Sequence, residues 1–235
     1  MIVVGKISVK AILENKKRDI HAVYLLKDKD DKDVRYVQRL TKGLKIEYVS
    51  REALDTLTGT TSHGGYAVDC GARHQDDIED LNRIFCIEGV SDPYNLGEIL
   101  RSLLALGVEG VLTPDYDFYE HEAKLIRASA GASEKIKWLK SEDVASDLIK
   151  LKAHDIKVIG AHRQEGSHSL VDYQWPLKSC VCIGGALRGL SRNILDICDA
   201  YVRLDYDAKI ALSANSASTV FAYAQFQALK KGESL

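Results

Sequence analysis

The spacing of apolar residues along most of the chain predicts short strands that alternate with helices. After residue 82, short apolar runs predict strands at residues 83–87, 110–112, 135–139, 157–160, 181–183 and 201–204. Helical spacing and capping residues predict helices at residues 97–105, 121–130, 143–152, 191–197 and 216–229. Apolar strands separated by helices indicate a parallel sheet that helices cover on both faces, the α/β class.

The first 75 residues predict a separate, small α/β unit. Its helices are expected at residues 6–16 and 33–40, and its strands at residues 21–26, 45–49 and 66–69. Ser50 is a suitable N-cap for one more short helix, with Glu52 in the first turn. Residues 71–80, after the strand at residues 66–69, are polar and charged and contain no strand or helix pattern. We therefore expect domains at residues 1–75 and 82–235, joined by a linker at residues 76–81.

Composition agrees with a folded protein and adds little about its function. The chain has 235 residues, of which 46% are hydrophobic and 28% charged, close to the average for globular proteins. No apolar run approaches the roughly 18 to 20 residues that span a bilayer. The first residues do not resemble a signal peptide. We expect a cytoplasmic protein that does not bind a membrane.

The five cysteines fit a reducing compartment. Their odd number, and the position of most of them in apolar segments, indicate buried, reduced thiols rather than disulfides. Cys180 and Cys182 are two residues apart, so a strand would place both thiols on one face. Further metal ligands are not obvious nearby in the sequence, and we expect no metal site.

Overall charge does not favour nucleic-acid binding, since the net charge is −2 and the pI about 6.4. Local charge matters more, however, and the N-terminal third is locally basic through Lys10, Lys16, Lys17 and Arg18. From composition alone the chain is a soluble α/β protein.

Candidate chemistry lies in the loops after the strands, because parallel sheets bind ligands at the carboxyl ends of their strands. The loop after residues 83–87 opens a helix with Asn95 as a possible N-cap. Arg101 follows on the side of Gly97 and Ala105, which we expect to face the sheet and the loop crevice. An arginine there suits a phosphate or a developing charge. The alternative, a simple strand-to-helix connection, remains open.

Two later segments are also candidates. The loop at residues 184–190 contains glycines that allow a ligand to approach the backbone, but it has neither a dinucleotide fingerprint nor an ATP-binding P-loop pattern. Ser213 and Asn215 precede the last helix, where the pattern favours an N-cap over contact with a polar ligand.

In order, these segments resemble the SPOUT methyltransferases of the SpoU/TrmH type. The first family motif, D-P-x-N-x-G-x-x-x-R-[ST], corresponds to residues 92–102, from Asp92 to Ser102. The second, Gly-x-Glu-x-x-Gly-Leu, corresponds to Gly184-Gly185-Ala186-Leu187-Arg188-Gly189-Leu190. The third, Ile-Pro-Met followed by Ser-Leu-Asn, corresponds to Leu204-Asp205-Tyr206 and Ser213-Ala214-Asn215. Residues 1–75 resemble the ribosomal-protein-like, substrate-binding domain that often precedes this catalytic domain.

The resemblance implies a C-terminal trefoil knot, a homodimer with active sites near the subunit interface, and transfer of a methyl group from S-adenosylmethionine to a ribose 2′-hydroxyl of ribosomal or transfer RNA. DNA is not an expected partner. Carried over by position, the residues expected to act on the acceptor are Arg101, Asn95, Ser213 and Asn215. Those expected to hold the cofactor are Ile183, Gly184, Gly189, Leu190, Leu204 and Ala214.

The chain also departs from the family pattern. Ala186 stands where the loop glutamate is expected, and Leu204-Asp205-Tyr206 replaces Ile-Pro-Met. Asp205 is a candidate substitute for the missing carboxylate. One alternative function is therefore an RNA-binding relative with weak or no methyl transfer. Another is a small-molecule-binding α/β domain without an RNA partner.

Overall fold

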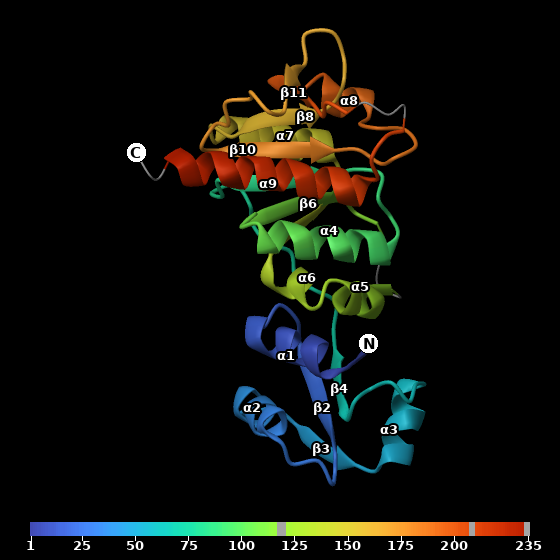
Figure 1. The fold of residues 1–235 in the computed structure, drawn as a ribbon. Helices are drawn as coiled ribbons and strands as arrows, with labels where there is room; N and C mark the ends of the chain where they lie inside the picture. Colours follow the sequence, from blue (N-terminus) through green and yellow to red (C-terminus); the bar gives the residue numbers. More distant parts are fainter. Residues whose placement is uncertain (117–120, 207–209, 233–235) are drawn as a thin grey trace. The chain divides into compact units, whose positions relative to one another are not determined.

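The structure is a computed structural model that describes residues 1–116, 121–206 and 210–232. The chain forms two compact units, labelled by element in Figure 1. The first unit comprises Met1–His74 and Asp117–Lys135, and the second comprises Gln75–Tyr116 and Ile136–Leu235. The sequence-based division differs at one segment, because residues 121–135 pack with the first 74 residues rather than with the chain around them.

The first unit is built on a four-stranded sheet with strand order β1-β4-β2-β3. Its strands are β1 (Ile2–Val4), β2 (Ile20–Leu26), β3 (Ile46–Val49) and β4 (Tyr66–Cys70). Its helices are α1 (Lys6–Asn15), α2 (Lys32–Leu40), α3 (Arg51–Thr58), α5 (Glu122–Ala128) and α6 (Ala132–Lys135). Ser50 caps α3 by accepting a hydrogen bond from the Ala53 N–H at 3.2 Å, as expected. Ile126 of α5 joins the same buried cluster as Ile12 of α1 and Leu25 of β2, so α5 completes this unit's core.

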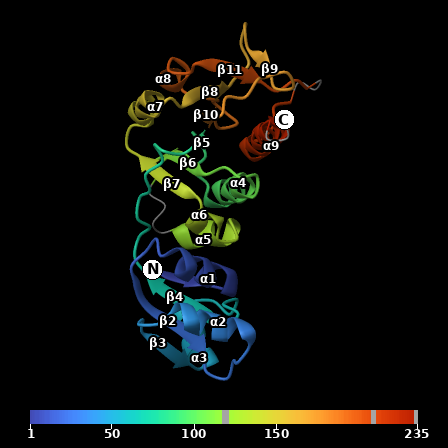
Figure 2. The same ribbon diagram turned by 90° about the vertical axis from the view of Figure 1, so that its left-hand side faces the viewer.

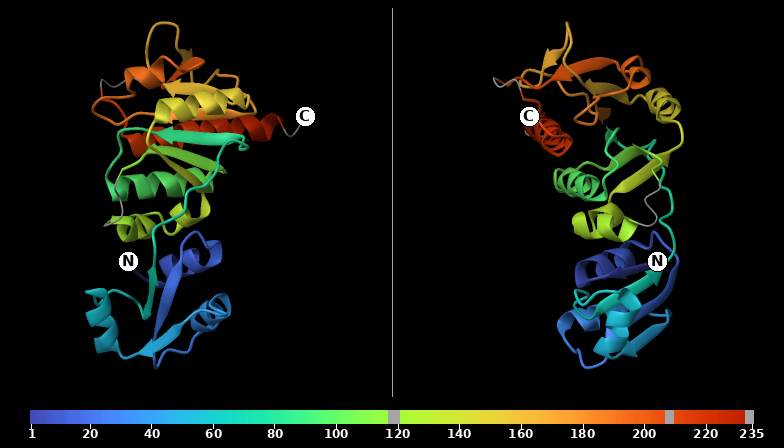
Figure 3. Two further views of the ribbon diagram at one scale, coloured as in Figure 1. Left: turned by 180° about the vertical axis from the view of Figure 1, so that it is seen from behind. Right: turned by 90° about the vertical axis from the view of Figure 1, so that its right-hand side faces the viewer.

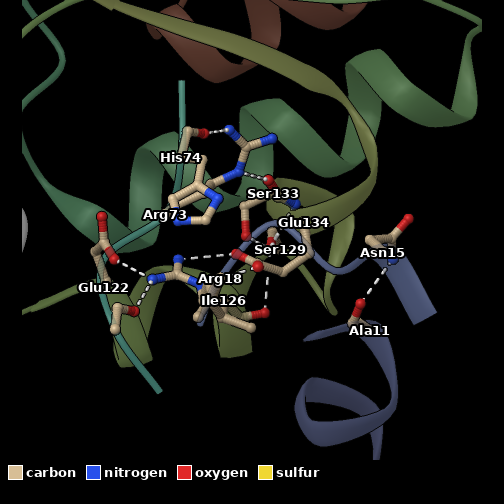
Figure 4. A network of polar contacts seen from close by, with 11 residues as sticks. Ala11, Asn15, Arg18, Arg73, His74, Glu122, Ile126, Ser129, Ser133 and Glu134 are labelled. Atoms are coloured by element: carbon tan, nitrogen blue, oxygen red, sulfur yellow. Dashed lines mark hydrogen bonds and ion pairs between the residues drawn. The ribbon is translucent and has the colours of Figure 1, made fainter. Parts of the chain in front are cut away.

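A buried ion network holds α5 and α6 in the first unit. Arg18 donates from Nε and Nη2 to the Glu134 carboxylate, both at 2.9 Å, and from Nη1 to Glu122 at 2.5 Å (Figure 4). Nη1 also donates to the Gly71 carbonyl at 3.1 Å. All three charged side chains are at most 2% exposed. Burial alone would lower the pKa of Arg18, but the hydrogen bonds to Glu134 and Glu122 raise it above its ordinary value. Arg18 is therefore not part of a basic surface, contrary to the sequence-based expectation.

The second unit is built on a seven-stranded sheet with strand order β7-β6-β5-β10-β8-β11-β9. Its strands are β5 (Arg83–Ile87), β6 (Gly110–Pro114), β7 (Lys137–Ser141), β8 (Lys157–Ala161), β9 (His168–Ser169), β10 (Ser179–Ile183) and β11 (Ala200–Arg203). Every neighbouring pair of strands is parallel. The predicted parallel sheet is thus confirmed, while β1, β9 and α6 were not predicted because each is very short.

Helices cover both faces of this sheet. Helices α4 (Pro93–Ala105) and α9 (Ala214–Gly232) lie side by side on one face, and α7 (Val144–Ala153) and α8 (Arg192–Leu195) on the other (Figures 2 and 3). In the central strand β10, Cys180 and Cys182 both face α7 and α8, as their spacing predicts. Ser179 accepts a hydrogen bond from Gln225 of α9 at 2.8 Å, which ties the last helix to β10.

The cysteines are free, and four of the five are buried, Cys198 being partly exposed. Within residues 1–116, 121–206 and 210–232, no three His, Cys, Asp or Glu side chains are placed to hold a metal ion. The same part of the chain contains no helix with the length and apolar character needed to cross a membrane.

Replacing Arg18 tests the buried network. The Arg18→Met substitution should lower the free energy of unfolding by about 3 to 5 kcal/mol, because it removes the guanidinium to which two buried carboxylates are bonded. Arg35 in α2 is exposed and makes none of these contacts, so Arg35→Met should change stability by no more than about 0.5 kcal/mol. Urea unfolding measures both variants. Equal changes in the free energy of unfolding for Arg18→Met and Arg35→Met would show that the buried network does not stabilise the fold.

Candidate active site

A pocket of about 200 Å³ lies at the carboxyl ends of β8, β10 and β11 and beside the start of α9. This is the edge where parallel sheets bind ligands. Five of the six residues expected to hold the cofactor line it: Ile183, Gly184, Gly189, Leu204 and Ala214. The sixth, Leu190, is buried and belongs to the core cluster beneath the loop. The structure therefore brings the second and third candidate segments together at one place.

The glycine loop at residues 184–190 folds back on itself without space for side chains. A Cβ on Gly184 would lie 2.1 Å from the carbonyl carbon of Gly189 and 2.3 Å from the Leu190 nitrogen. A Cβ on Gly185 would lie 2.6 Å from the carbonyl oxygen of Gly89, in the loop after β5. The Gly189 N–H donates to the Gly185 carbonyl at 2.9 Å and closes the loop. Backbone atoms of this loop thus form one wall of the pocket.

Glu88, which the sequence motifs do not include, holds this loop in place. Its N–H donates to the Ile183 carbonyl at 2.9 Å, and its carboxylate accepts from the Ser191 N–H at 2.7 Å. Glu88 is therefore hydrogen-bonded to the chain on both sides of residues 184–190. The available signal was an acidic residue directly after a buried strand, at the ligand-binding edge of the sheet.

The first turns of α4 and α9 meet through side-chain hydrogen bonds. Asn215 donates to the Glu98 carboxylate at 2.9 Å and to the Asn95 amide oxygen at 3.4 Å. The structure thus brings together two of the expected acceptor-binding residues, which are 120 positions apart in sequence. Ser213 caps α9 by accepting from the Ser216 N–H at 3.2 Å, the role that the pattern favoured.

Asn95 itself is not the N-cap of α4, and that prediction was wrong. Asp92 occupies the cap and accepts from the Asn95 N–H at 2.9 Å, and Pro93 begins the helix. The helix therefore starts four residues earlier than residue 97. Proline at the first helical position lacks only an N–H that would have no partner inside the helix, which explains the early start.

Arg101 does not point where its spacing predicted. It is exposed on α4, in line with Tyr94, Glu98 and Ala105, while Gly97 lies on the buried side. Within the described part of the chain it makes no hydrogen bond or ion pair, and it does not line the 200 Å³ pocket. The prediction that Arg101 faces the sheet was wrong because α9 lies beside α4 and leaves this side of the helix open. Arg101 is still only one turn beyond Glu98, on the same exposed side.

Asp205 has a different role from that of a substitute glutamate. Its carboxylate accepts from the Ser169 hydroxyl at 2.5 Å and from Arg203 Nε at 2.9 Å. These two hydrogen bonds hold the pKa of Asp205 below its usual range. Asp205 is absent from the lining of the pocket, whereas Ala186 is part of it. The missing loop carboxylate is therefore not replaced by Asp205.

The lining includes three basic side chains, His162, Arg163 and Arg203, and the phenol of Tyr206. No acidic side chain belongs to the lining, in the part of the chain that the structure describes. The rest is backbone of the glycine loop and small or apolar side chains such as Ala214 and Phe221. Such a lining fits a nucleoside, which needs apolar contact for the base and backbone hydrogen bonds for its polar edge.

Comparison with known proteins agrees with this arrangement. The profile described as the SpoU rRNA Methylase family matches residues 82–223, and the one described as RNA 2′-O ribose methyltransferase substrate binding matches residues 2–75. The 23S rRNA (guanosine-2′-O-)-methyltransferase RlmB of Yersinia pestis is 28% identical over 214 residues, covering 86% of this chain and 87% of that protein. RlmB of Shewanella oneidensis is 25% identical over 246 residues, covering 99% and 98%.

Solved structures show the same fold. The SpoU methyltransferase AviRb from Streptomyces viridochromogenes, solved in complex with the cofactor AdoMet, superposes with a TM-score of 0.81 at 18% identity. The match covers 99% of this chain and 91% of that one.

The chain belongs to the SpoU rRNA Methylase family. The two matched regions are those of an RNA 2′-O-ribose methyltransferase, which confirms the class expected from the sequence motifs.

The closed glycine loop gives a direct test of the pocket. Gly184→Ala should reduce the affinity for S-adenosylmethionine at least about tenfold, because the new methyl group collides with backbone that cannot move aside independently. Gly71→Ala is the matched control, since its Cβ would meet only an ordinary contact at 3.8 Å. Isothermal titration calorimetry measures both. Unchanged affinity in Gly184→Ala would place the cofactor elsewhere.

Proposed function

We propose that the second unit transfers the methyl group of S-adenosylmethionine to a ribose 2′-hydroxyl of ribosomal RNA. The observation that carries this proposal is that residues from separate motifs line the same pocket: Ile183, Gly184, Gly189, Leu204 and Ala214. The relatives named as 23S rRNA guanosine 2′-O-methyltransferases favour ribosomal RNA as the substrate class, with transfer RNA as the alternative.

The reaction requires the protein to position the 2′-hydroxyl and to stabilise the charge that develops on it. A 2′-hydroxyl is a weak nucleophile that must lose its proton as it attacks, so it must lie in line with the methyl group and near a group that tolerates the developing charge. The cofactor supplies the activated methyl group. Asn215 would orient Asn95 and Glu98, to which its amide nitrogen already donates, and the amide nitrogen of Asn95 would meet the acceptor near the start of α4, where a helix N-terminus favours negative charge. Arg101, on the same open side of α4, would bind the phosphate beside the acceptor ribose.

We also propose that the first unit binds the RNA substrate. Its residues 2–75 match the substrate-binding profile. Exposed cations of this unit, including Lys16, Lys27 and Lys42, are available for phosphates. Arg18 is not, because Glu122 and Glu134 neutralise it in the core.

The strand order supports the expected trefoil knot. Strand β10 lies between β5 and β8 in the sheet, although β8 precedes β10 in the sequence. Strand β11 lies on the other side of β8. The chain after β10 would pass through the loop formed before it. An experimental structure in which this segment does not thread the loop would contradict the knot.

The exposed side of α4 and α9 supports a homodimer. Tyr94 of α4 is 58% exposed, and Val220 and Tyr223 of α9 are 39% and 53% exposed. Apolar side chains gathered on neighbouring helices are typical of a surface that a partner covers. A monomeric mass in analytical ultracentrifugation would contradict this. We place the protein in the cytoplasm, where its free cysteines stay reduced; localisation of a tagged chain tests that.

Methyl transfer from labelled S-adenosylmethionine to ribosomal RNA tests the activity. Arg101→Ala should lower transfer at least about a hundredfold, as expected when a group that handles transition-state charge is removed. Cofactor affinity should be unchanged, because Arg101 does not line the pocket. Arg192→Ala, which removes an exposed arginine paired with Asp196, is the control and should retain full activity. Parallel losses of transfer and cofactor binding in Arg101→Ala would contradict the assigned role.

One observation favours a second candidate, a relative that binds RNA without methylating it. Ala186 lines the pocket where the family carries a glutamate, and Asp205 does not compensate. The same assay separates the two functions. RNA binding without transfer in the wild-type chain would establish the second, and restoring glutamate by Ala186→Glu should then create activity.

A further inference from the structure

Two arginines line the 200 Å³ pocket, and they differ in whether a carboxylate neutralises them. Arg203 donates from Nε to Asp205 at 2.9 Å, and its Nη1 donates to the Ser167 carbonyl. Its charge is therefore compensated next to the pocket. Arg163 has no carboxylate partner among the described residues. The pocket thus contains one guanidinium without an ion pair among the described residues, although the Asp205 carboxylate is near enough to interact with it electrostatically.

Arg163 is held in a defined position. It follows the carboxyl end of β8 by two residues, and the preceding His162 N–H donates to the Val202 carbonyl at 3.1 Å, joining this segment to β11. Its Nη2 donates to the Leu204 carbonyl, and its guanidinium lies 5.2 Å from the ring centroid of Tyr206. A guanidinium has five N–H donors, so most of them remain for a ligand. Stacking on an aromatic ring leaves the edge of the guanidinium free to bind an anion.

We propose that Arg163 is a positioning residue that binds the carboxylate of the methionine part of S-adenosylmethionine. This proposal rests on the proposed function and identifies a contact within it. The carboxylate is the only anionic group of the cofactor, whose sulfonium and amino groups are cationic. With no acidic side chain in the described lining, the pocket favours the anionic end of the ligand beside Arg163. Paired guanidinium and carboxylate groups form two parallel hydrogen bonds, which would fix the direction in which the methyl group points.

The matched ligand for a test is decarboxylated S-adenosylmethionine, which keeps the sulfonium, the amino group and the adenosine. In calorimetry without RNA, the wild-type chain should bind S-adenosylmethionine at least about tenfold more tightly than this analogue, the order expected for one charge-assisted hydrogen bond. Arg163→Gln should weaken S-adenosylmethionine binding by a similar factor and should not weaken the analogue. Arg188→Gln is the control, since Arg188 is exposed on the same glycine loop but absent from the lining.

The other outcomes overturn either the proposed contact or the proposed function. If Arg163→Gln weakens both ligands equally, Arg163 only supports the pocket and the proposed contact is wrong. If it leaves both affinities unchanged but reduces RNA binding, Arg163 binds a phosphate instead, and the proposed contact is again wrong. If the wild-type chain binds the two ligands equally tightly, no group recognises the carboxylate, but the proposed function stands. If it binds neither, the proposed function itself fails.

Discussion

The candidate active site depends on direct backbone contact between two loops, the turn at Gly89 after β5 and residues 184–190 after β10. A Cβ on Gly185 would lie 2.6 Å from the Gly89 carbonyl oxygen, and a Cβ on Gly184 would lie 2.1 Å from Gly189 within the glycine loop itself. Glu88 fixes this arrangement by binding the chain before and after the glycine loop. Because the pocket wall is backbone, its shape tolerates changes in neighbouring side chains. The pocket of this chain therefore does not depend on a side chain at Ala186 for its shape.

Electrostatics then distinguish the side chains that surround this fixed wall. Asp205 and Arg203 neutralise one another, so neither contributes a net charge to the pocket. Arg163 retains its charge at the pocket, and Arg101 retains its charge on the open side of α4. In the first unit, by contrast, the charge of Arg18 is neutralised in the core by ion pairs with Glu122 and Glu134. The same residue type is thus exposed and available to a ligand in one unit and part of the buried core in the other.

Much of the fold follows from the sequence because buried strands and amphipathic helices leave periodic patterns. Strand β5 was predicted at the residues where it lies, and Cys180 and Cys182 share a face as their spacing requires. Long-range packing left no such pattern. Nothing local indicates that residues 121–135 join the first unit, or that α9 lies beside α4 and leaves Arg101 exposed. The prediction that Asn95 is an N-cap failed for a local reason, because Asp92 followed by Pro93 is the stronger helix start.

The pocket residues were predictable through family motifs, whereas Glu88, Arg163 and the pairing of Asp205 required the three-dimensional arrangement. The central claim is that this arrangement methylates a ribose in RNA. Mapping 2′-O-methylation across ribosomal and transfer RNA, in cells with and without the gene, tests it most directly. The account predicts that one ribose methylation disappears with the gene and returns when the intact gene is restored. An unchanged methylation map would contradict it.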